Sequence, residues 1–227
     1  MKTPLKLVIF DVDGTLVDSQ NAIVASMTYA FTKAGRRVPT RQEALGIVGL
    51  SLPEAMAVLA PDASTSEQLQ LAADYKLGPS DTREDGKAVA EAALYDGVPE
   101  AIHGIDGAGF QLSAATGKSR RGLDRFLAVH GFETMFFGTQ TADDAPSKPH
   151  PQMIFNSLTA NGVDAEHAVM IGDTEYDMAM GRAAGVRTIG VSWGYHELDR
   201  VHRGGADAIA EAPGELMGLV EELIGRP

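Results

Sequence analysis

Two aspartates follow a short apolar stretch near the N-terminus and are the first candidates for chemistry. Leu7–Phe10 is entirely apolar, which is typical of a buried strand in a parallel sheet, and Asp11 and Asp13 come directly after it. In open α/β sheets, ligands bind just beyond the carboxyl ends of the strands. Side chains alternate along a strand, so both carboxylates point to the same side unless the turn at Gly14 alters this. Carboxylates held that close favour a cation or a shared proton between them, whereas the alternative is a solvated turn that merely ends the strand.

A second apolar stretch ends in acidic residues in the same way. Residues 168–171 are apolar, Asp173 lies at the turn that follows, and Asp177 comes four residues later. Taken alone, Asp177 is explained by its favourable charge in the first turn of a helix. Adjacent strands would, however, bring several carboxylates to one edge, where each unscreened pair about 4 Å apart costs up to about 4 kcal/mol at an effective dielectric of about 20. A hard divalent cation relieves such repulsion, and magnesium is the natural candidate.

A hydroxyl and a glycine follow a third strand-like stretch, residues 110–115. Thr116 and Gly117 offer a hydroxyl and free backbone amides at the start of a helix, which together can cradle a phosphate. A helix N-cap is the ordinary explanation of Thr116 in isolation. The stretch Gly117-Lys118-Ser119 also resembles the end of a nucleotide-binding P-loop, but Leu112 stands where that motif requires a glycine, which excludes it.

Lys148 stands among prolines, in the stretch Pro146-Ser147-Lys148-Pro149. Elsewhere an exposed lysine would be the ordinary interpretation. Here the restricted backbone and the position at the ligand edge of the sheet indicate a fixed cation, which could anchor a nucleophilic carboxylate and bind a phosphate oxygen. The 6 histidines show no metal-ligand spacing, and we assign them no role in chemistry.

The elements that must position these residues alternate between strands and helices. Strand-like stretches cover residues 7–10, 110–115, 135–137, 168–171 and 188–191, and helical patterns cover 122–130, 151–161 and 177–184. This alternation predicts an α/β fold, a Rossmann-like parallel sheet with helices on both faces. Between the first two strands lie further helical patterns at 21–34, 51–59, 66–77 and 85–93. We therefore expect residues 18–92 to form an all-helical insertion, and residues 1–17 and 93–227 to form the sheet domain.

The composition narrows the class of protein and its partners. The chain has 227 residues, 44% of them hydrophobic and 22% charged, as in an ordinary globular protein. Its net charge of −12 disfavours nucleic acid and anionic membranes as partners, so an anionic substrate needs local cations. The absence of cysteine excludes disulfides and thiolate metal sites. The first apolar stretch is too short for a signal peptide and none approaches a membrane span, so we expect a cytoplasmic location; the sequence does not indicate the oligomeric state.

Taken in order, these motifs resemble the four motifs of the haloacid dehalogenase-like (HAD) superfamily. They are the stretch Asp11-Val12-Asp13-Gly14-Thr15, then Thr116, then Lys148-Pro149, then Gly172-Asp173-Thr174 with Asp177. The likeness spans the whole sheet domain, and the helical insertion resembles the C1-type cap of that superfamily. Residues 49–54, 115–123 and 191–195 also resemble its phosphoglycolate phosphatase-like branch.

The resemblance implies a division of labour between the two N-terminal aspartates. Asp11 would be the nucleophile that attacks phosphorus in line and forms an aspartyl-phosphate. Asp13 would protonate the leaving alcohol and then take a proton from the water that hydrolyses the intermediate. The presence of Asp13 also argues against a dehalogenase, because a halide needs no proton and that branch lacks the second aspartate.

The resemblance also implies how phosphate and metal would be held. Thr116 and the Gly117 amide would bind the phosphoryl oxygens, and Lys148 would bind them and offset their charge. Asp177 would orient the metal shell or Lys148 from outside that shell. Magnesium would be bound by three groups, namely the Asp11 carboxylate, the Asp13 backbone carbonyl and the Asp173 carboxylate.

The implied activity is a magnesium-dependent phosphatase that hydrolyses a small phosphorylated metabolite, with a 2-phosphoglycolate-like ester as the first candidate. A β-phosphoglucomutase-like phosphomutase, which would use the same motifs, is the alternative. A non-enzymatic, phosphate-accepting regulatory domain is a distant one, because it does not explain a large insertion after the first strand.

The insertion leaves the substrate open. It matches the family weakly beyond Glu54, and Asp96 stands where many relatives have proline after the tyrosine. Candidates for holding the far end of the substrate are the loop at residues 46–51 and, less firmly, Arg41 or Lys76, for which a solvated helix face is the ordinary explanation.

Overall fold

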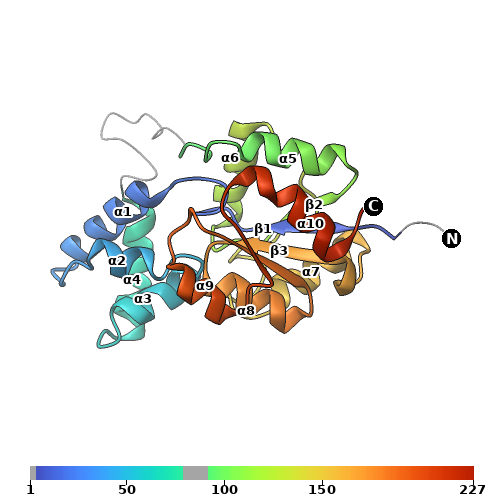
Figure 1. The fold of residues 1–227 in the computed structure, drawn as a ribbon. Coiled ribbons are helices and arrows are strands. Elements are labelled where there is room, and N and C mark those ends of the chain that lie inside the picture. The colour runs from blue at the N-terminus through green and yellow to red at the C-terminus, as the bar shows by residue number, and fades with distance from the viewer. Residues whose placement is uncertain (1–3, 79–91) are drawn as a thin grey trace.

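A parallel sheet forms the centre of the computed structural model, which describes residues 4–78 and 92–227 (Figure 1). The sheet has five strands in the order β2-β1-β3-β4-β5, all paired in parallel. The strands are β1 (Leu7–Phe10), β2 (Gln111–Ala114), β3 (Ala168–Gly172), β4 (Arg187–Val191) and β5 (Ala208–Ala210). The chain leaves β1 toward β2 on one side and continues with β3 on the other, so the strand order reverses between β1 and β3.

Helices cover both faces of this sheet (Figure 1). Val8 and Phe10 point toward the face covered by α5 (Val98–Gly107), α6 (Arg120–His130) and α10 (Leu216–Ile224). Leu7 and Ile9 point toward the opposite face, covered by α7 (Gln152–Asn161) and α8 (Glu175–Ala184), with α9 (Leu198–Gly204) packed on α8. This alternation is the period of two that a strand imposes on its side chains. The predicted α/β fold is confirmed.

A separate group of helices follows β1 along the chain and lies beyond the carboxyl ends of the strands (Figure 1). It comprises α1 (Gln20–Lys33), α2 (Arg41–Leu45), α3 (Leu52–Leu59) and α4 (Thr65–Lys76). Capping boxes at Thr40 and Ser64 begin α2 and α4, respectively. The group packs around its own apolar cluster, which includes Met27, Phe31 and Met56. The four helices therefore share an apolar core that is separate from the cores on the two faces of the sheet.

Several elements differ from those predicted from the sequence. Residues 135–137 do not form a strand: Phe136 makes one isolated bridge to Leu112, and Gly138, in the left-handed conformation with φ 64°, interrupts the extended backbone. Ser119 and Thr174 cap α6 and α8, which therefore begin two residues earlier than expected. The predicted helix at 85–93 falls almost entirely outside the described residues. The elements not predicted are α2, α5, α9, α10, β5 and two short 3-10 turns, Ala165–His167 and Pro213–Glu215.

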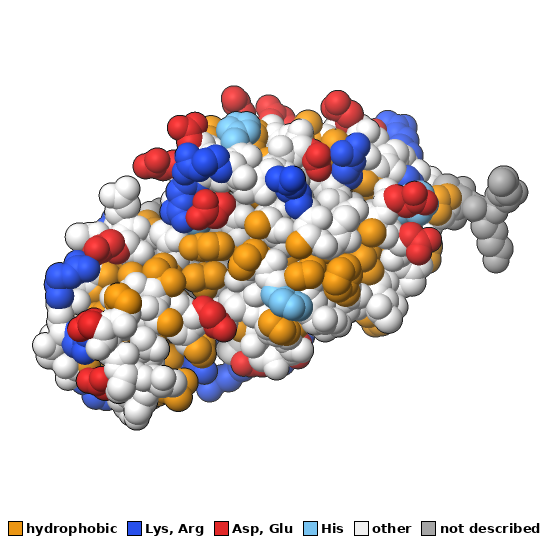
Figure 2. All heavy atoms as spheres, turned by 90° about the horizontal axis from the view of Figure 1, so that it is seen from below, with side chains coloured by type: hydrophobic (Ala, Val, Ile, Leu, Met, Phe, Trp, Pro, Cys, Tyr) orange, Lys and Arg blue, Asp and Glu red, His pale blue; other side chains and the backbone are white. Residues whose placement is uncertain are grey.

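The surface mixes charges of both signs. On the face seen in Figure 2, acidic and basic side chains lie interspersed around a band of hydrophobic ones. The net charge of −12 is thus not gathered in one acidic region of that face. Among the helices of residues 4–78 and 92–227, none combines the length and the hydrophobicity needed to span a bilayer.

Candidate active site

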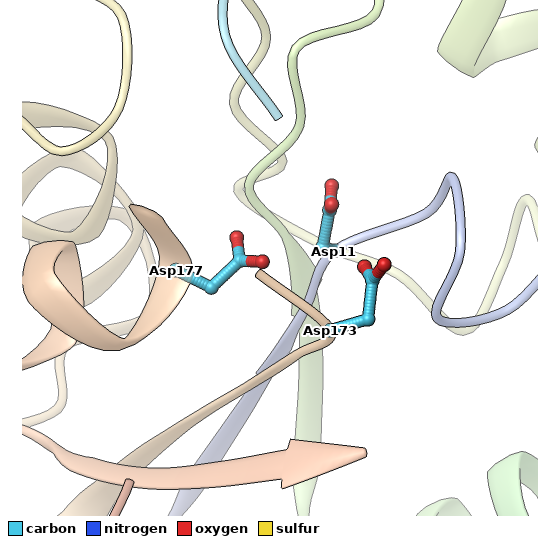
Figure 3. Close-up of side chains that lie close together, drawn as sticks. All are labelled: Asp11, Asp173 and Asp177. Atoms are coloured by element: carbon cyan, nitrogen blue, oxygen red, sulfur yellow. The ribbon is translucent and has the colours of Figure 1, made fainter. Parts of the chain in front are cut away.

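The carboxyl ends of β1 and β3 meet where the strand order reverses. Phe10 is paired with Ile171, and the Asp11 backbone amide donates to the Ile171 carbonyl at 2.9 Å. Asp11 and Asp173 therefore leave the sheet side by side, and Asp177 reaches the same point from the first turn of α8 (Figure 3). Such a reversal point is where open α/β sheets bind ligands.

Asp11, Asp173 and Asp177 form a buried acidic cluster that fits a divalent cation. One carboxylate oxygen from each lies within 4.8 Å of the others, and no side chain of the three is more than 1% exposed. Among the described residues, none donates a hydrogen bond to either buried oxygen of Asp11. Burial raises the pKa of Asp11 to about 6, although the Lys148 ammonium opposes the rise, and burial also raises the pKa of Asp173 well above its ordinary value. Carboxylate oxygens are hard ligands of the kind magnesium prefers, and those of Asp11 accept no hydrogen bond that would compete with a metal ion.

Three glycines make room for these carboxylates. Gly14 has φ +84°, and a Cβ there would lie 2.3 Å from Oδ2 of Asp173. A Cβ at Gly172 would lie 2.3 Å from Cγ of Asp177, and one at Gly194 would lie 2.0 Å from Cβ of Asp173. Any side chain at these positions would occupy the space of the cluster. The Asp-Gly turn after β1 is therefore the backbone shape that lets two strand ends bring their acids together.

Lys148 is buried between two of the carboxylates. Its Nζ lies 2.6 Å from Oδ1 of Asp177 and 2.9 Å from Oδ1 of Asp11, and the side chain is 1% exposed or less. Only the contact with Asp177 has the directional geometry of a hydrogen bond. Burial alone would lower the pKa of Lys148, but the charges of Asp11 and Asp177 outweigh burial and raise it. The lysine is thus a fixed cation that faces Asp11.

The protein itself occupies both oxygens of Asp177. Oδ1 accepts from Lys148, and Oδ2 accepts from the Thr174 amide at 3.0 Å and the Thr174 hydroxyl at 2.7 Å. The Thr174 hydroxyl accepts in turn from the Asp177 amide, which completes a capping box at the start of α8. The cap of α8 therefore holds the Asp177 carboxylate in place, and this carboxylate in turn positions Lys148.

Asp173 is held by two donors from distant parts of the chain. Its Oδ1 accepts from the Thr15 hydroxyl at 3.1 Å, and its Oδ2 accepts from the Tyr195 amide at 2.8 Å. The sequence analysis assigned no role to Thr15 or Tyr195. Both lie in stretches that carry the family likeness, which was the available signal.

Asp13 stands apart from the cluster, at the edge of a cavity. Its Oδ1 accepts from the Ser19 hydroxyl and lies 2.9 Å from Nζ of Lys118. The Ser19 hydroxyl also lies 3.1 Å from the Tyr195 hydroxyl. Ser19 and Lys118 were not predicted as site residues. Lys118 lies in the stretch 115–123 that carries the family likeness, and Ser19 follows the first motif by a few residues.

The cavity above Asp11 has a volume of about 260 Å³ and is bounded by both groups of elements. Asp11, Asp13, Thr116 and Gly117 line it from the sheet side. Lys148, Asp173 and Asp177 lie buried around Asp11, so the structure brings together every site residue predicted from the sequence. From the other side, the cavity is lined by Lys76 and by residues 47–50 of the loop at residues 46–51. Arg41 does not line it, because its guanidinium donates to Gln20 and Asn21 instead.

The loop at residues 46–51 is bound to the sheet side at both ends. The Gly46 carbonyl accepts from Nε2 of His196 at 3.1 Å and from Arg200 at 3.4 Å, and the Ser51 amide donates to the Ser147 hydroxyl at 2.7 Å. Burial, with the charge of Arg200, lowers the pKa of His196 to about 4, and Glu175 and Asp177 oppose this. The histidine is therefore neutral near pH 7.

A Cβ on Gly117 would lie 2.7 Å from the Leu50 carbonyl oxygen, so the loop at residues 46–51 packs closely against the stretch that contains Thr116 and Gly117. Two glycine-containing segments from the two groups of elements thus close the cavity between them.

Comparisons with known proteins agree with this fold and site. The model of the family described as haloacid dehalogenase-like hydrolase matches residues 8–191. The chain belongs to this family. It is 31% identical over 219 residues to the probable phosphatase IndB of Dickeya dadantii, a match that covers 96% of this chain and 94% of that protein. It is 28% identical over 220 residues to the pyrophosphatase PpaX of Bacillus pumilus, covering 96% and 98% of the two chains.

The fold is also that of a solved structure. The crystal structure of a predicted phosphatase from Clostridium acetobutylicum has a TM-score of 0.84 and 23% sequence identity, and the match covers 97% of this chain and 100% of that chain. At this identity the likeness concerns the fold. With the family match, the superfamily and the phosphatase class predicted from the sequence are confirmed.

Proposed function

We propose that the protein is a magnesium-dependent phosphatase that hydrolyses a small-molecule phosphomonoester through an aspartyl-phosphate. The strongest support is the environment of Asp11. This buried carboxylate lines the cavity, faces Lys148 and accepts no hydrogen bond from any described residue. A carboxylate oxygen without a donor is available to attack phosphorus. The adjacent ammonium keeps Asp11 ionised despite its burial and so preserves the nucleophile.

Asp13 is the proton-transfer group in this proposal. It protonates the alcohol oxygen as the P–O bond breaks, and then removes a proton from the water that attacks the aspartyl-phosphate. Ser19 and Lys118 hold its carboxyl group at the cavity edge, which supports this role. The proton gained from water in one turnover replaces the proton given to the alcohol.

The remaining site residues bind and neutralise the phosphoryl group. Thr116 and the Gly117 amide hold phosphoryl oxygens, and Lys148, positioned by Asp177, offsets their charge. Magnesium would supply further positive charge at the phosphoryl oxygens. It would be held by Asp11, the Asp13 carbonyl and Asp173, the last of these fixed by its own two donors.

We assign residues 18–92 to a cap domain and residues 1–17 and 93–227 to the catalytic domain. The separate apolar cluster of α1–α4 and its position over the cavity support this division. A small phosphorylated metabolite, with 2-phosphoglycolate as the first candidate, is the proposed substrate. The cytoplasmic location expected from the sequence stays a prediction.

Phosphate release from an aryl phosphate tests the reaction. Hydrolysis should require magnesium, stop in EDTA, and disappear in Asp11→Asn, because an amide cannot form the acyl phosphate. Asp106→Asn, the same change at an exposed residue of α5, is the matched control and should retain activity. Unchanged turnover in Asp11→Asn would show that Asp11 is not the nucleophile.

A panel of 2-phosphoglycolate, hexose phosphates, nucleotides and pyrophosphate, ranked by kcat/KM, tests the substrate class. Phosphate release without a bisphosphate activator supports a phosphatase. Isomerisation of a sugar phosphate that depends on such an activator would instead indicate a phosphomutase.

A further inference from the structure

The cavity has two chemically different walls. One is apolar and comes from α1, the loop at residues 46–51 and α3. It is formed by side chains without hydrogen-bonding groups, including Ile23, Met27, Ile47, Leu52 and Ala55. A sugar placed against this wall would lose the water bound to its hydroxyls without gaining partners there. The wall therefore favours an apolar alcohol over a polyol.

The other wall is basic. The charged residues among the described lining of the cavity are the acids Asp11 and Asp13 and the bases Lys118, Arg121 and Arg125 on the sheet side, with Lys76 at the end of α4 on the other side. Bases therefore outnumber acids among these lining residues, although the net charge of the protein as a whole is −12. It also differs from the mixed charges of the surface in Figure 2. Local cations of this kind attract an anionic ligand into a protein that otherwise repels it.

The basic residues have different tasks. Lys118 is paired with Asp13 at 2.9 Å, at the proton-transfer position. Arg121 and Arg125 lie four residues apart on α6, about 6 Å along the helix axis, and so share one face. Both line the cavity, whereas the phosphoryl group already has Lys148, Thr116 and the proposed metal for its charge.

We infer that the natural substrate is a phosphomonoester of an apolar alcohol that carries a second anionic group, and that Arg121 and Arg125 bind this second anion. The inference rests on the proposed function and adds to it the chemistry of the leaving group. The apolar wall takes the body of the alcohol, and the paired arginines take a carboxylate or second phosphate beyond it. The 2-phosphoglycolate of the first guess shares the second anion but lacks the apolar body.

Four esters of primary alcohols separate these features. Carboxybenzyl phosphate carries both the ring and the carboxylate, benzyl phosphate only the ring, 2-phosphoglycolate only the carboxylate, and glucose 6-phosphate neither. We expect kcat/KM for carboxybenzyl phosphate to exceed that for benzyl phosphate by about tenfold or more, the effect of one hydrogen bond to a charged group. It should exceed that for 2-phosphoglycolate by about tenfold or more as well, the effect of burying the ring against the apolar wall. Phosphate release is measured with the full chain and magnesium.

Variants at the arginines test the assignment of the second anion. Arg121→Met, alone and with Arg125→Met, should lower kcat/KM for carboxybenzyl phosphate more than for benzyl phosphate. The ratio of the two kcat/KM values should therefore fall toward one. Arg226→Met removes the same charge from an exposed residue paired with Glu221 and should leave the preference unchanged.

Three outcomes would overturn the inference. Equal losses on both benzyl esters would assign the arginines to the reacting phosphoryl group. Hydrolysis without any preference for the carboxylated ester would contradict the inference while leaving the proposed function intact. No hydrolysis of any ester by the unmodified protein would contradict both.

Discussion

Asp11→Asn is expected to stabilise the fold while it removes the proposed nucleophile. The pKa of this carboxyl rises from 3.8 to about 6 on folding, first because of burial and then because of Asp177, against the opposing effect of Lys148. A raised pKa means that the stability contributed by the group is fully present below pH 3.8 and is lost as the pH rises through about 6. At 1.36 kcal/mol per pKa unit, the ionised carboxylate destabilises the fold by about 3 kcal/mol. Neutral asparagine avoids this cost.

Urea unfolding in EDTA measures the effect at two pH values. The free energy of unfolding of Asp11→Asn should exceed that of the unmodified protein by about 3 kcal/mol at pH 8. At pH 4 the two should differ little, because the native carboxyl is then protonated. Magnesium should then stabilise the unmodified protein more than the variant, because the variant lacks one proposed ligand.

Asp177→Asn is the matched control with the opposite sign. Its carboxylate accepts from Lys148 and Thr174, so the substitution should destabilise by about 1.5–3 kcal/mol. The electrostatic account of the cluster is refuted if Asp11→Asn is less stable than the unmodified protein at pH 8.

Substitutions at three other positions should change stability or activity in a direction that the structure predicts. Lys148→Met leaves buried carboxylates uncompensated and should cost about 3–5 kcal/mol in urea unfolding, with loss of phosphate release; a change below 1 kcal/mol would contradict this. Gly117→Ala places a Cβ 2.7 Å from the Leu50 carbonyl and should lower kcat/KM, whereas Gly107→Ala, with open space around it, should not. Folding lowers the pKa of His196 from 6.5 to about 4, so the free energy of unfolding should fall by about 3 kcal/mol as the pH falls through that range. Unfolding measured at several pH values should show this loss, and His196→Gln should abolish it.

Local patterns in the sequence were sufficient to predict strands β1 to β4 and the motifs that lie near their carboxyl ends. The apolar run Leu7–Phe10 predicted a strand buried on both faces, and it forms one, whereas the apolar run at residues 135–137 does not form a strand. Carboxylates placed at the ends of two such strands predicted the edge at which they meet. Short or weakly patterned elements were missed, because the three residues of β5 and the five of α2 are too few to show a period.

The sequence by itself determined which groups the site contains: the carboxylate of the proposed nucleophile, the hydroxyl, the lysine and the acidic loop. The tertiary structure decided how they are held. Ser19 and Lys118 converge on Asp13, and Tyr195 fixes Asp173, although these residues come from separate segments of the chain. The apolar and basic walls of the cavity were likewise decided by packing. The physical reason is that the period of a strand and the cap of a helix depend on a few consecutive residues. Contacts across the sheet edge depend instead on the strand order, which brings together residues distant along the chain.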